Sequence, residues 1–403
     1  MSEPVIGIDL GTTYSAVATV EDGHPVLIPN RAGGRLTPSM VGFTRKGARV
    51  VGEQARLLAE EVPENVAYAT KRFLGRRFSP ELAESAKALV QYPLVGGAAG
   101  EVRLQLAGKA LPLSQVSAMI LGELKLDAQA HFGRSVTKAV ITVPANFDDQ
   151  QRAATKEAAR IAGLEVLRIL NEPTAAAVAY GLTANFTGSA LVFDLGGGTF
   201  DVSILEVESG VFEVKGTGGD PNLGGEDFDL RIVEWLLAQV DPTLSDVVRG
   251  DRLSMQRLKS AAERAKRVRS EKDEALISVA DLGDHLAAKR FVEVETALTR
   301  AFFETLSEPL SRRCLGVCKK VMEEADLDPR ELDAVLLVGG MTRVPLVRLL
   351  EKGAEEAPDV DSAATVASVK ALVDVGKAAH KARDLEKMAE VTQTLAKLVG
   401  SRS

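Results

Sequence analysis

The strongest constraint on this fold is a short glycine-centred motif that occurs twice. The first copy, Asp9 to Thr13, reads Asp-Leu-Gly-Thr-Thr, and the second, Asp194 to Thr199, reads Asp-Leu-Gly-Gly-Gly-Thr. In both places a β-favouring segment ends at an aspartate, turns at glycine and threonine, and resumes as a second strand. Internal similarity at this separation predicts two related lobes of one α/β fold, facing each other. The long stretches between the copies predict an inserted subdomain within each lobe.

These turns have the chemistry of an anion site. Successive backbone N–H groups and threonine hydroxyls donate hydrogen bonds to phosphate, and an aspartate at the end of a strand suits hydrated Mg²⁺. The first turn alone is equally consistent with an ordinary hairpin. The second is not, because three consecutive glycines weaken a hairpin unless the backbone approaches a ligand closely. The two turns together predict a clamp on a polyphosphate, while the P-loop and dinucleotide patterns are absent in usable form.

Other elements can be read from the same signals. Strands are predicted over 138–143, which ends before Pro144, and over 334–338, which precedes Gly339-Gly340. The stretch Phe200 to Val207 reads as an alternating strand. A helix is predicted over 152–162, with acidic residues before it and Gly163 as its stop.

Composition limits the class of partner and the compartment. The net charge of the 403-residue chain is −7, which argues against nucleic acid or an anionic membrane as the main partner. The N-terminus has neither a basic region nor a long apolar stretch, so no signal peptide or membrane span is expected. The protein is expected to be cytoplasmic. Cys314 and Cys318 would share one helix face, and with no nearby histidine they are expected to be plain reduced thiols.

Longer motifs extend this pattern along most of the chain, collinear from about residue 4 to about residue 350. They are Gly7 to Ser15, Thr70 to Arg76, Ile141 to Ala145, Asn171 to Ala177, Phe193 to Val202, Leu223 to Asp229, Glu263 to Arg267 and Leu337 to Pro345. This text resembles the nucleotide-binding domain of the seventy-kilodalton heat-shock (DnaK-type) chaperones, in the superfamily of sugar kinases, heat-shock proteins and actin. The resemblance implies an actin-like ATPase fold of the ribonuclease H type. Lobe I is expected over 1–185 with an insertion at about 38–113, and lobe II over 186–352 with an insertion at about 227–303.

The resemblance assigns the hydrolytic residues. Lys71 would reach the γ-phosphate and position the attacking water, Glu172 would orient water near the metal, and Asp201 would support that network. From the residues alone, Lys71 could be a solvated charge, and Glu172 could be a carboxylate at the start of an Ala-rich helix. Such catalysis consists of positioning and charge neutralisation at the γ-phosphoryl group.

The ligand set implied by the resemblance is ATP or ADP with Mg²⁺, and K⁺ as an optional further cation. Asp9 and Asp194 would hold the magnesium ion through water. Phosphate contacts would come from the two turns, at Gly11, Thr12, Thr13, Tyr14, Gly196, Gly197, Gly198 and Thr199.

The stretch 258–272 is rich in lysine and arginine. Read alone, it is a solvated basic helix face, with a nucleic-acid surface as the weaker alternative. The resemblance instead assigns four of its residues to adenosine: Glu263, Lys266, Arg267 and Ser270. From the other side, Gly339, Gly340 and Arg343 would close the base pocket, with Arg343 stacked on the purine, and Gly224 and Gly225 would form the turn beneath the hinge.

The chain departs from the family pattern in three places. Asn146 replaces the usual aromatic residue, and Met341 replaces a small polar residue beside the expected purine. After Arg348 only faint similarity remains, and neither the family's interdomain linker nor its peptide-binding domain is expected. Residues 353–403 instead predict an amphipathic helical tail, either docked on the body or binding a partner.

These observations favour a slow ATPase whose two lobes close on Mg-ATP and signal to a partner. A J-domain-type cochaperone, a nucleotide-exchange factor and an unknown client or regulatory protein are the expected partners. Pro144 and Arg168 match positions that the family uses in J-protein contact and interlobe signalling. Two alternatives stay open: a non-enzymatic, nucleotide-dependent interaction module that uses the tail helix, and a small-molecule kinase of the same superfamily.

Overall fold

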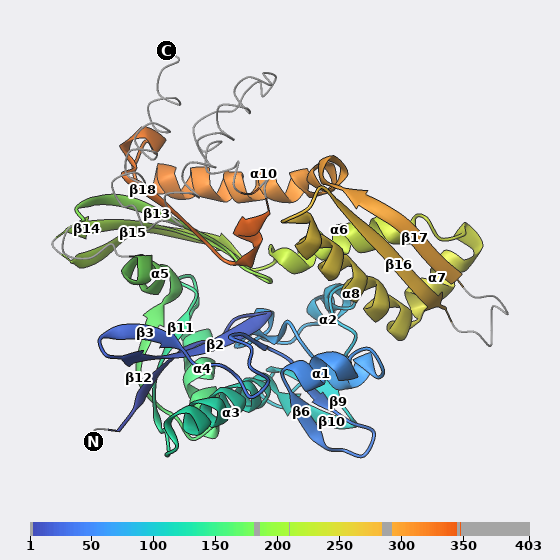
Figure 1. The fold of residues 1–403 in the computed structure, drawn as a ribbon, viewed down its shortest axis with the longest axis horizontal. Coiled ribbons are helices and arrows are strands. Elements are labelled where there is room, and N and C mark those ends of the chain that lie inside the picture. Colours follow the sequence, from blue (N-terminus) through green and yellow to red (C-terminus); the bar gives the residue numbers. More distant parts are fainter. Residues whose placement is uncertain (1–2, 181–185, 209, 284–291, 345–346, 348–403) are drawn as a thin grey trace, which may run out of the picture.

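The computed structural model describes residues 3–180, 186–208, 210–283, 292–344 and 347. Two α/β lobes face each other, with lobe I below and lobe II above in Figure 1. The fold expected from the sequence is confirmed. The tail predicted over 353–403 lies outside the described residues. Within the described ranges, no helix is long and apolar enough to cross a membrane.

Lobe I is built on a sheet with the strand order β12-β11-β1-β2-β3, with β4 also paired to β2. β1 runs antiparallel to β2 and parallel to β11, so a hairpin is extended by parallel strands. Alternate residues of β1 are buried, as expected for a strand with one face on a core. The strands are β1 (Val5–Asp9), β2 (Tyr14–Glu21), β3 (His24–Leu27), β4 (Thr37–Pro38), β11 (Lys138–Val143) and β12 (Glu165–Asn171).

Two helices, α3 (Leu113–Phe132) and α4 (Asp149–Ile161), pack on this sheet and on each other. α4 begins a few residues before its predicted start because Asp148 and Gln151 form a capping box. It ends at Ile161, one residue before the predicted end, and the predicted stop, Gly163, follows with a positive φ of 72°.

The region between β4 and α3 forms a mixed subdomain beside the lobe I sheet. It has two three-stranded sheets, of order β6-β5-β7 and β10-β9-β8. Its elements are β5 (Val41–Phe43), β6 (Arg49–Val51), α1 (Glu53–Leu58), the 3₁₀ helix η1 (Pro63–Asn65), β7 (Val66–Ala67), the 3₁₀ helix η2 (Thr70–Arg72), α2 (Pro80–Ala86), β8 (Leu94–Gly96), β9 (Val102–Leu106) and β10 (Lys109–Pro112).

Lobe II repeats the arrangement of lobe I, with the strand order β15-β14-β13-β18. β13, β14 and β15 form an antiparallel meander, and β18 runs parallel to β13 as β11 does to β1. This shared topology agrees with the prediction of one unit used twice. The strands are β13 (Gly188–Leu195), β14 (Phe200–Glu208), β15 (Val211–Asp220) and β18 (Ala334–Val338).

The alternation expected for β14 is wrong, because Phe200 to Leu205 are all buried. Phe200 and Ile204 join the large core of lobe II, whereas Leu205 packs on the other face with Ala177. A strand covered on both faces has no solvated side to alternate with.

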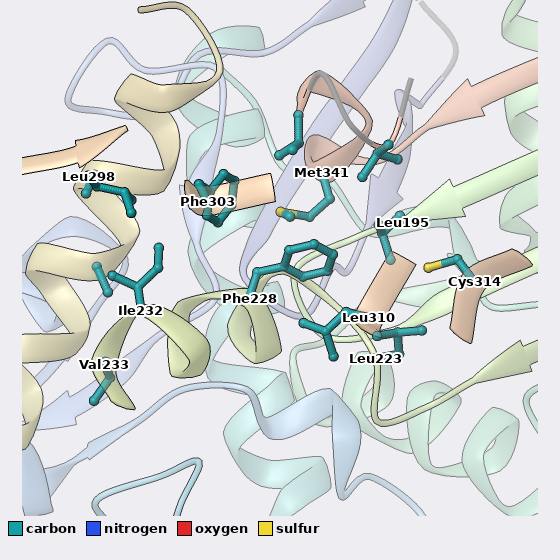
Figure 2. Close-up of a cluster of buried hydrophobic side chains, with 14 of the residues drawn as sticks. Leu195, Leu223, Phe228, Ile232, Val233, Leu298, Phe303, Leu310, Cys314 and Met341 are labelled. Carbon is teal, nitrogen blue, oxygen red and sulfur yellow. The ribbon is translucent and has the colours of Figure 1, made fainter. Parts of the chain in front are cut away.

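The rest of lobe II is mainly helical, with the two-stranded sheet β16-β17 packed on α8. Figure 2 shows its core, where Phe228, Phe303 and Met341 lie together. Cys314 and Cys318 are buried free thiols in α10, and burial raises the pKa of each to about 12. The elements are α6 (Gly225–Leu237), α7 (Pro242–Gly250), α8 (Arg252–Arg269), β16 (Glu274–Leu282), β17 (Val292–Thr299), α10 (Arg300–Glu324), the 3₁₀ helix η3 (Pro329–Glu331) and the 3₁₀ helix η4 (Gly340–Arg343).

Helix α5 (Glu172–Tyr180) connects the lobes. It begins directly after β12 of lobe I, and Ala177 is fully buried against β13, β14 and β18 of lobe II. In Figure 1 this helix lies between the two sheets. One end of α5 therefore belongs to the cleft and the other to the opposite lobe.

Candidate functional site

The two glycine-containing turns, one from each lobe, meet each other. A Cβ atom on Gly197 would collide with the hydroxyl of Thr13, and one on Gly198 would collide with the side chain of Thr12. Glycine is required at both positions because backbone and side chain approach so closely. The structure thus brings together the two turns that the sequence predicted to act as one site.

A buried serine holds the first turn. The N–H of Ser39 donates to the carbonyl of Thr13 at 2.8 Å, and its hydroxyl donates to the carbonyl of Gly11 at 2.8 Å. The Ser39 hydroxyl also lies 2.8 Å from that of Ser15. Sequence reasoning missed Ser39, because nothing local marks a serine that far from the turn.

The second turn is held by the start of α6. The N–H groups of Gly225 and Glu226 donate to the carbonyls of Gly196 and Gly197 at 3.0 and 2.8 Å. Gly224 leads into this helix, and a Cβ atom there would lie 2.6 Å from the backbone of Gly198. The predicted hinge glycines therefore contact the second turn directly.

Lys71 lies buried beside the turns. Its Nζ donates to Oε1 of Glu172 at 2.8 Å and stands 5.7 Å from the ring centroid of Phe147. The side chain of Lys71 is 8% exposed, so the alternative of a solvated charge is wrong. Glu172 is the first residue of α5, as its alternative interpretation expected, and it also pairs with the lysine.

Three aspartates surround this pair. Asp9 ends β1, Asp194 lies in β13, and Asp201 lies opposite Asp194 in β14. The Asp9 residue is exposed. Even so, partial desolvation by the surrounding protein, followed by the negative charge of Glu172, raises the pKa of Asp9 to about 6. Burial, followed by Glu172, raises the pKa of Asp201 to about 7, although Lys71 and the Thr199 hydroxyl oppose that shift.

The charges in this cluster are unbalanced. Burial and then Glu172, Asp201 and Asp9 raise the pKa of Asp194 well above its ordinary value. Burial disfavours charge on Lys71, but the surrounding carboxylates outweigh it and raise the pKa of the lysine. Four carboxyl groups share a single lysine, so additional positive charge would be stabilised here.

The residues present fit a magnesium ion bound with few protein ligands. All donors are oxygen atoms, as Mg²⁺ prefers, and the excess of carboxylates calls for a cation. Among the described residues, no three His, Cys, Asp or Glu side chains are grouped closely enough to hold a metal alone. Mg²⁺ usually keeps several waters and binds substrate phosphates, so a site with only one or two protein carboxylates, such as Asp9 and Asp194 would provide, is compatible with it.

The residues assigned to adenosine lie on α8, and one is already engaged. Nζ of Lys266 donates to Oδ2 of Asp229 and to the carbonyl of Gly225, both at 2.8 Å. This buried lysine links α8 to α6. Burial raises the pKa of Asp229 to about 6, with Lys266 opposing that shift.

The other α8 residues face the cleft more openly. Arg267 is exposed, lies 4.0 Å from Glu263, and donates to the hydroxyl of Tyr14 in lobe I at 3.3 Å. Ser270 caps the end of the helix, with its hydroxyl 3.4 Å from the carbonyl of Lys266. Tyr14, Glu263 and Arg267 thus come together across the cleft.

The loop after β18 approaches from the other side. Gly339 has a φ of 87°, and a Cβ atom there would collide with the carbonyl of Leu195 and lie 2.7 Å from Oδ1 of Asp194. Gly340 and Arg343 are exposed in η4. Met341, in the same loop, has its side chain 4% exposed and packed in the lobe II core (Figure 2), and its Sδ lies 2.9 Å from where a Cβ atom on Gly225 would stand.

Ion pairs and other polar contacts also join the two lobes. Nη2 of Arg72 lies 2.6 Å from Oδ2 of Asp227, and Nε lies 3.6 Å from Oε2 of Glu226. Lys259 donates to the carbonyl of Leu89 and lies over the ring of Tyr68. Sequence reasoning assigned no role to these contacts, which pair residues from opposite lobes.

The electrostatics of this contact depend on pH. Burial raises the pKa of Glu226 to about 7; Arg72 and Lys259 oppose the shift, while Asp227 and Asp229 add to it. Burial lowers the pKa of Lys259 to about 8. Both groups therefore titrate near neutral pH.

Duplicated sheets of this order, closing on a shared cleft, are the architecture of the actin-like ATPases. Within that class the comparison is specific: the model of the family described as Hsp70 protein matches residues 5–392. The chain belongs to the Hsp70 family. Its members are ATP-dependent chaperones that bind ATP with Mg²⁺ and generally work with cochaperones. The match extends beyond the last motif read from the sequence, which ends at Pro345.

Proposed function

We propose that this chain binds Mg-ATP between its two turns and hydrolyses the γ-phosphate, and that lobe closure reports the nucleotide state to a partner. The observation that carries the proposal is the buried ion pair of Lys71 and Glu172 among three further carboxyl groups. A binding site alone has no need for a buried lysine beside so many acids. A hydrolytic site uses them to hold phosphate, metal and water.

Each group has a distinct task in this proposal. The backbone N–H groups and hydroxyls of the turns, at Thr12, Thr13 and Thr199, bind phosphate oxygens. Lys71 donates to the γ-phosphate and stabilises the charge on the transferring group. Glu172 and Asp201 accept hydrogen bonds from the attacking water. When bound, Mg²⁺ neutralises phosphate charge, and Asp9 and Asp194 would hold it.

The route from the site to a partner runs through α5. Glu172 is held by Lys71 in the cleft, while Ala177 of the same helix is packed into the sheet of lobe II. A change at the γ-phosphate can therefore tilt the helix against the other lobe. Arg168 is exposed on β12, an edge strand next to this helix, which supports a J-domain-type cochaperone as a partner. A nucleotide-exchange factor is proposed from family membership alone.

The Lys71→Ala variant tests the hydrolytic assignment. We expect single-turnover hydrolysis to fall by about 100-fold or more, since removing one preorganised donor costs about that much. Affinity for ADP, which lacks the γ-phosphate, is expected to change little. Lys46→Ala, at an exposed lysine in the lobe I insertion, is the matched control.

The same assay separates the alternatives. Full hydrolysis by Lys71→Ala would contradict the role given to this lysine. A wild type that binds ATP without turnover would instead be a nucleotide-dependent interaction module. Turnover that requires a sugar acceptor would indicate a small-molecule kinase.

A further inference from the structure

A cavity of about 480 Å³ opens beside Lys71 at the border of the two lobes. None of the residues assigned to adenosine line this cavity. It therefore adjoins Lys71 on a different side from the one assigned to the nucleoside. Its lining comes from η2 and the loop after it, from the segment that enters α4, and from lobe II. The lining residues that matter are Lys71, Arg72, Arg76, Arg77, Asn146, Asp148 and Thr199.

This lining is strongly cationic. It contains four basic side chains and one carboxylate, that of Asp148, which accepts the N–H of Gln151 at the start of α4. Within the described part of the chain, Arg76 and Arg77 have no ion-pair partner. The guanidinium of Arg76 donates only to the carbonyl of Arg72, at 3.5 Å. Two cations of the cavity are therefore available to an anion.

The cations lead from the interior to the surface. Lys71 and Arg72 are buried, Arg76 is half-buried and Arg77 is exposed. Arg72 is only 5% exposed, and its guanidinium is already paired with Asp227 and Glu226 of lobe II. Arg76 and Arg77 are therefore the cations of this cavity that an anion would meet without displacing an ion pair.

Neutral donors complete the wall. Gly75 lets the loop after η2 approach the first turn of α4, since a Cβ atom there would lie 2.8 Å from Cα of Gln151. The start of α4 carries the positive end of the helix dipole. Asn146 is exposed, and its Nδ2 reaches toward β15, where a Cβ atom on Gly219 would lie 2.6 Å away. The cavity thus spans both lobes, and Asn146 is the lining residue that reaches from lobe I toward β15.

We propose that this cavity binds a small oxyanion and is the route by which inorganic phosphate leaves after hydrolysis. The inference rests on the proposed function, in which the water oxygen joins the γ-phosphorus, the bond to the bridging oxygen breaks, and ADP, phosphate and a proton result. Lys71 and Thr199 belong both to the catalytic cluster and to the inner wall, so the phosphate is released into the cavity. Arg76 and Arg77 then pair with it on the way out.

Phosphate binding is measured first, by titrating inorganic phosphate into the full chain with ADP and Mg²⁺ in a calorimeter. We expect Arg76→Gln/Arg77→Gln to weaken binding by about tenfold, the effect of losing about one charge-assisted hydrogen bond. The control Arg45→Gln/Lys46→Gln removes the same charge from an exposed hairpin of lobe I and should leave binding unchanged. Equal binding by wild type and the Arg76/Arg77 variant would overturn the proposal.

The exit route is tested by single-turnover kinetics, with hydrolysis read by chemical quench and release read by a fluorescent phosphate sensor. Asn146→Tyr narrows the cavity at an exposed position, so the fold should tolerate it. We expect unchanged hydrolysis and at least about fivefold slower release. Release at the wild-type rate would refute the exit route. A wild type that binds phosphate in this cavity but hydrolyses no ATP would refute the proposed function, and would leave an oxyanion site supplied from solution.

Discussion

The ion pair between Arg72 and Asp227 gives a sharp test of how the lobes are held together. Asp227 has two roles: it accepts from Arg72 across the cleft and from the N–H of Gly224, at 2.8 Å, at the start of α6. Asp227→Asn keeps an oxygen for the second role, because asparagine accepts hydrogen bonds at helix starts as well as aspartate does. The substitution therefore isolates the charge across the cleft.

The magnitude follows from the burial of the pair. Removing one partner of a buried pair costs about 3–5 kcal/mol. Here Asp227 is 19% exposed, and Glu226 remains 3.6 Å from Arg72, so the loss is reduced. We expect about 1–2 kcal/mol, which is about 5- to 30-fold in the equilibrium between closed and open lobes.

The assay is dissociation of a fluorescent ADP analogue in a stopped-flow instrument, since opening the lobes frees the nucleotide. Dissociation should accelerate by about 5- to 30-fold in Asp227→Asn and stay unchanged in Asp246→Asn, a control at an exposed aspartate of α7. A double-mutant cycle with Arg72→Gln should show coupling. Simple addition of the two effects, or wild-type dissociation in Asp227→Asn, would refute the reasoning.

Three further variants test other parts of the structure. Gly224→Ala places a Cβ atom against the backbone of Gly198 and should lower the free energy of unfolding by about 2–4 kcal/mol. The control Gly250→Ala has open space around the new Cβ atom and should be near neutral. Equal melting temperatures of the two variants would contradict this prediction. Met341→Ala should lower stability by about 2–4 kcal/mol through a core cavity while nucleotide affinity is retained, and a selective loss of affinity would place the side chain in the base pocket instead. The pKa of Glu226 is higher in the folded protein than in the unfolded chain, so between about pH 4.5 and about pH 7 the folded protein keeps a proton that the unfolded chain has lost. The free energy of unfolding of the wild type should therefore fall as pH rises through this range. Glu226→Gln should flatten that part of the melting-temperature profile, and a parallel profile would contradict the assignment.

Local signals made parts of this structure predictable from the sequence. The strand predicted over 138–143 is β11 with the same bounds, because it is a short β-branched run stopped by Pro144. The second turn was predictable too, since three glycines in succession have few structural explanations, whereas the first turn became recognisable only as its counterpart.

Pairings set by tertiary packing were not predictable. Ser39 supports a turn that lies 28 residues earlier, and Lys266 pairs with Asp229, 37 residues earlier. Met341 sits in a motif that suggests a ligand contact, and only the fold shows that its side chain is also part of the lobe II core. From the residues alone Lys71 could be a solvated charge, and only the fold shows Glu172 beside it. In each case the deciding partner is distant in sequence.

The position of β18 has a consequence for how the chain folds as it is synthesised. The sheet of lobe I is complete once β12 ends at Asn171, whereas that of lobe II needs β18, which ends at Val338, to pair with β13. Closing such a long loop is slow, and N-terminal units generally fold first during synthesis. Lobe I can therefore be folded while β13 still exposes the edge that β18 will cover. During that interval the nascent chain itself presents an unpaired apolar strand, the kind of surface that recruits chaperones.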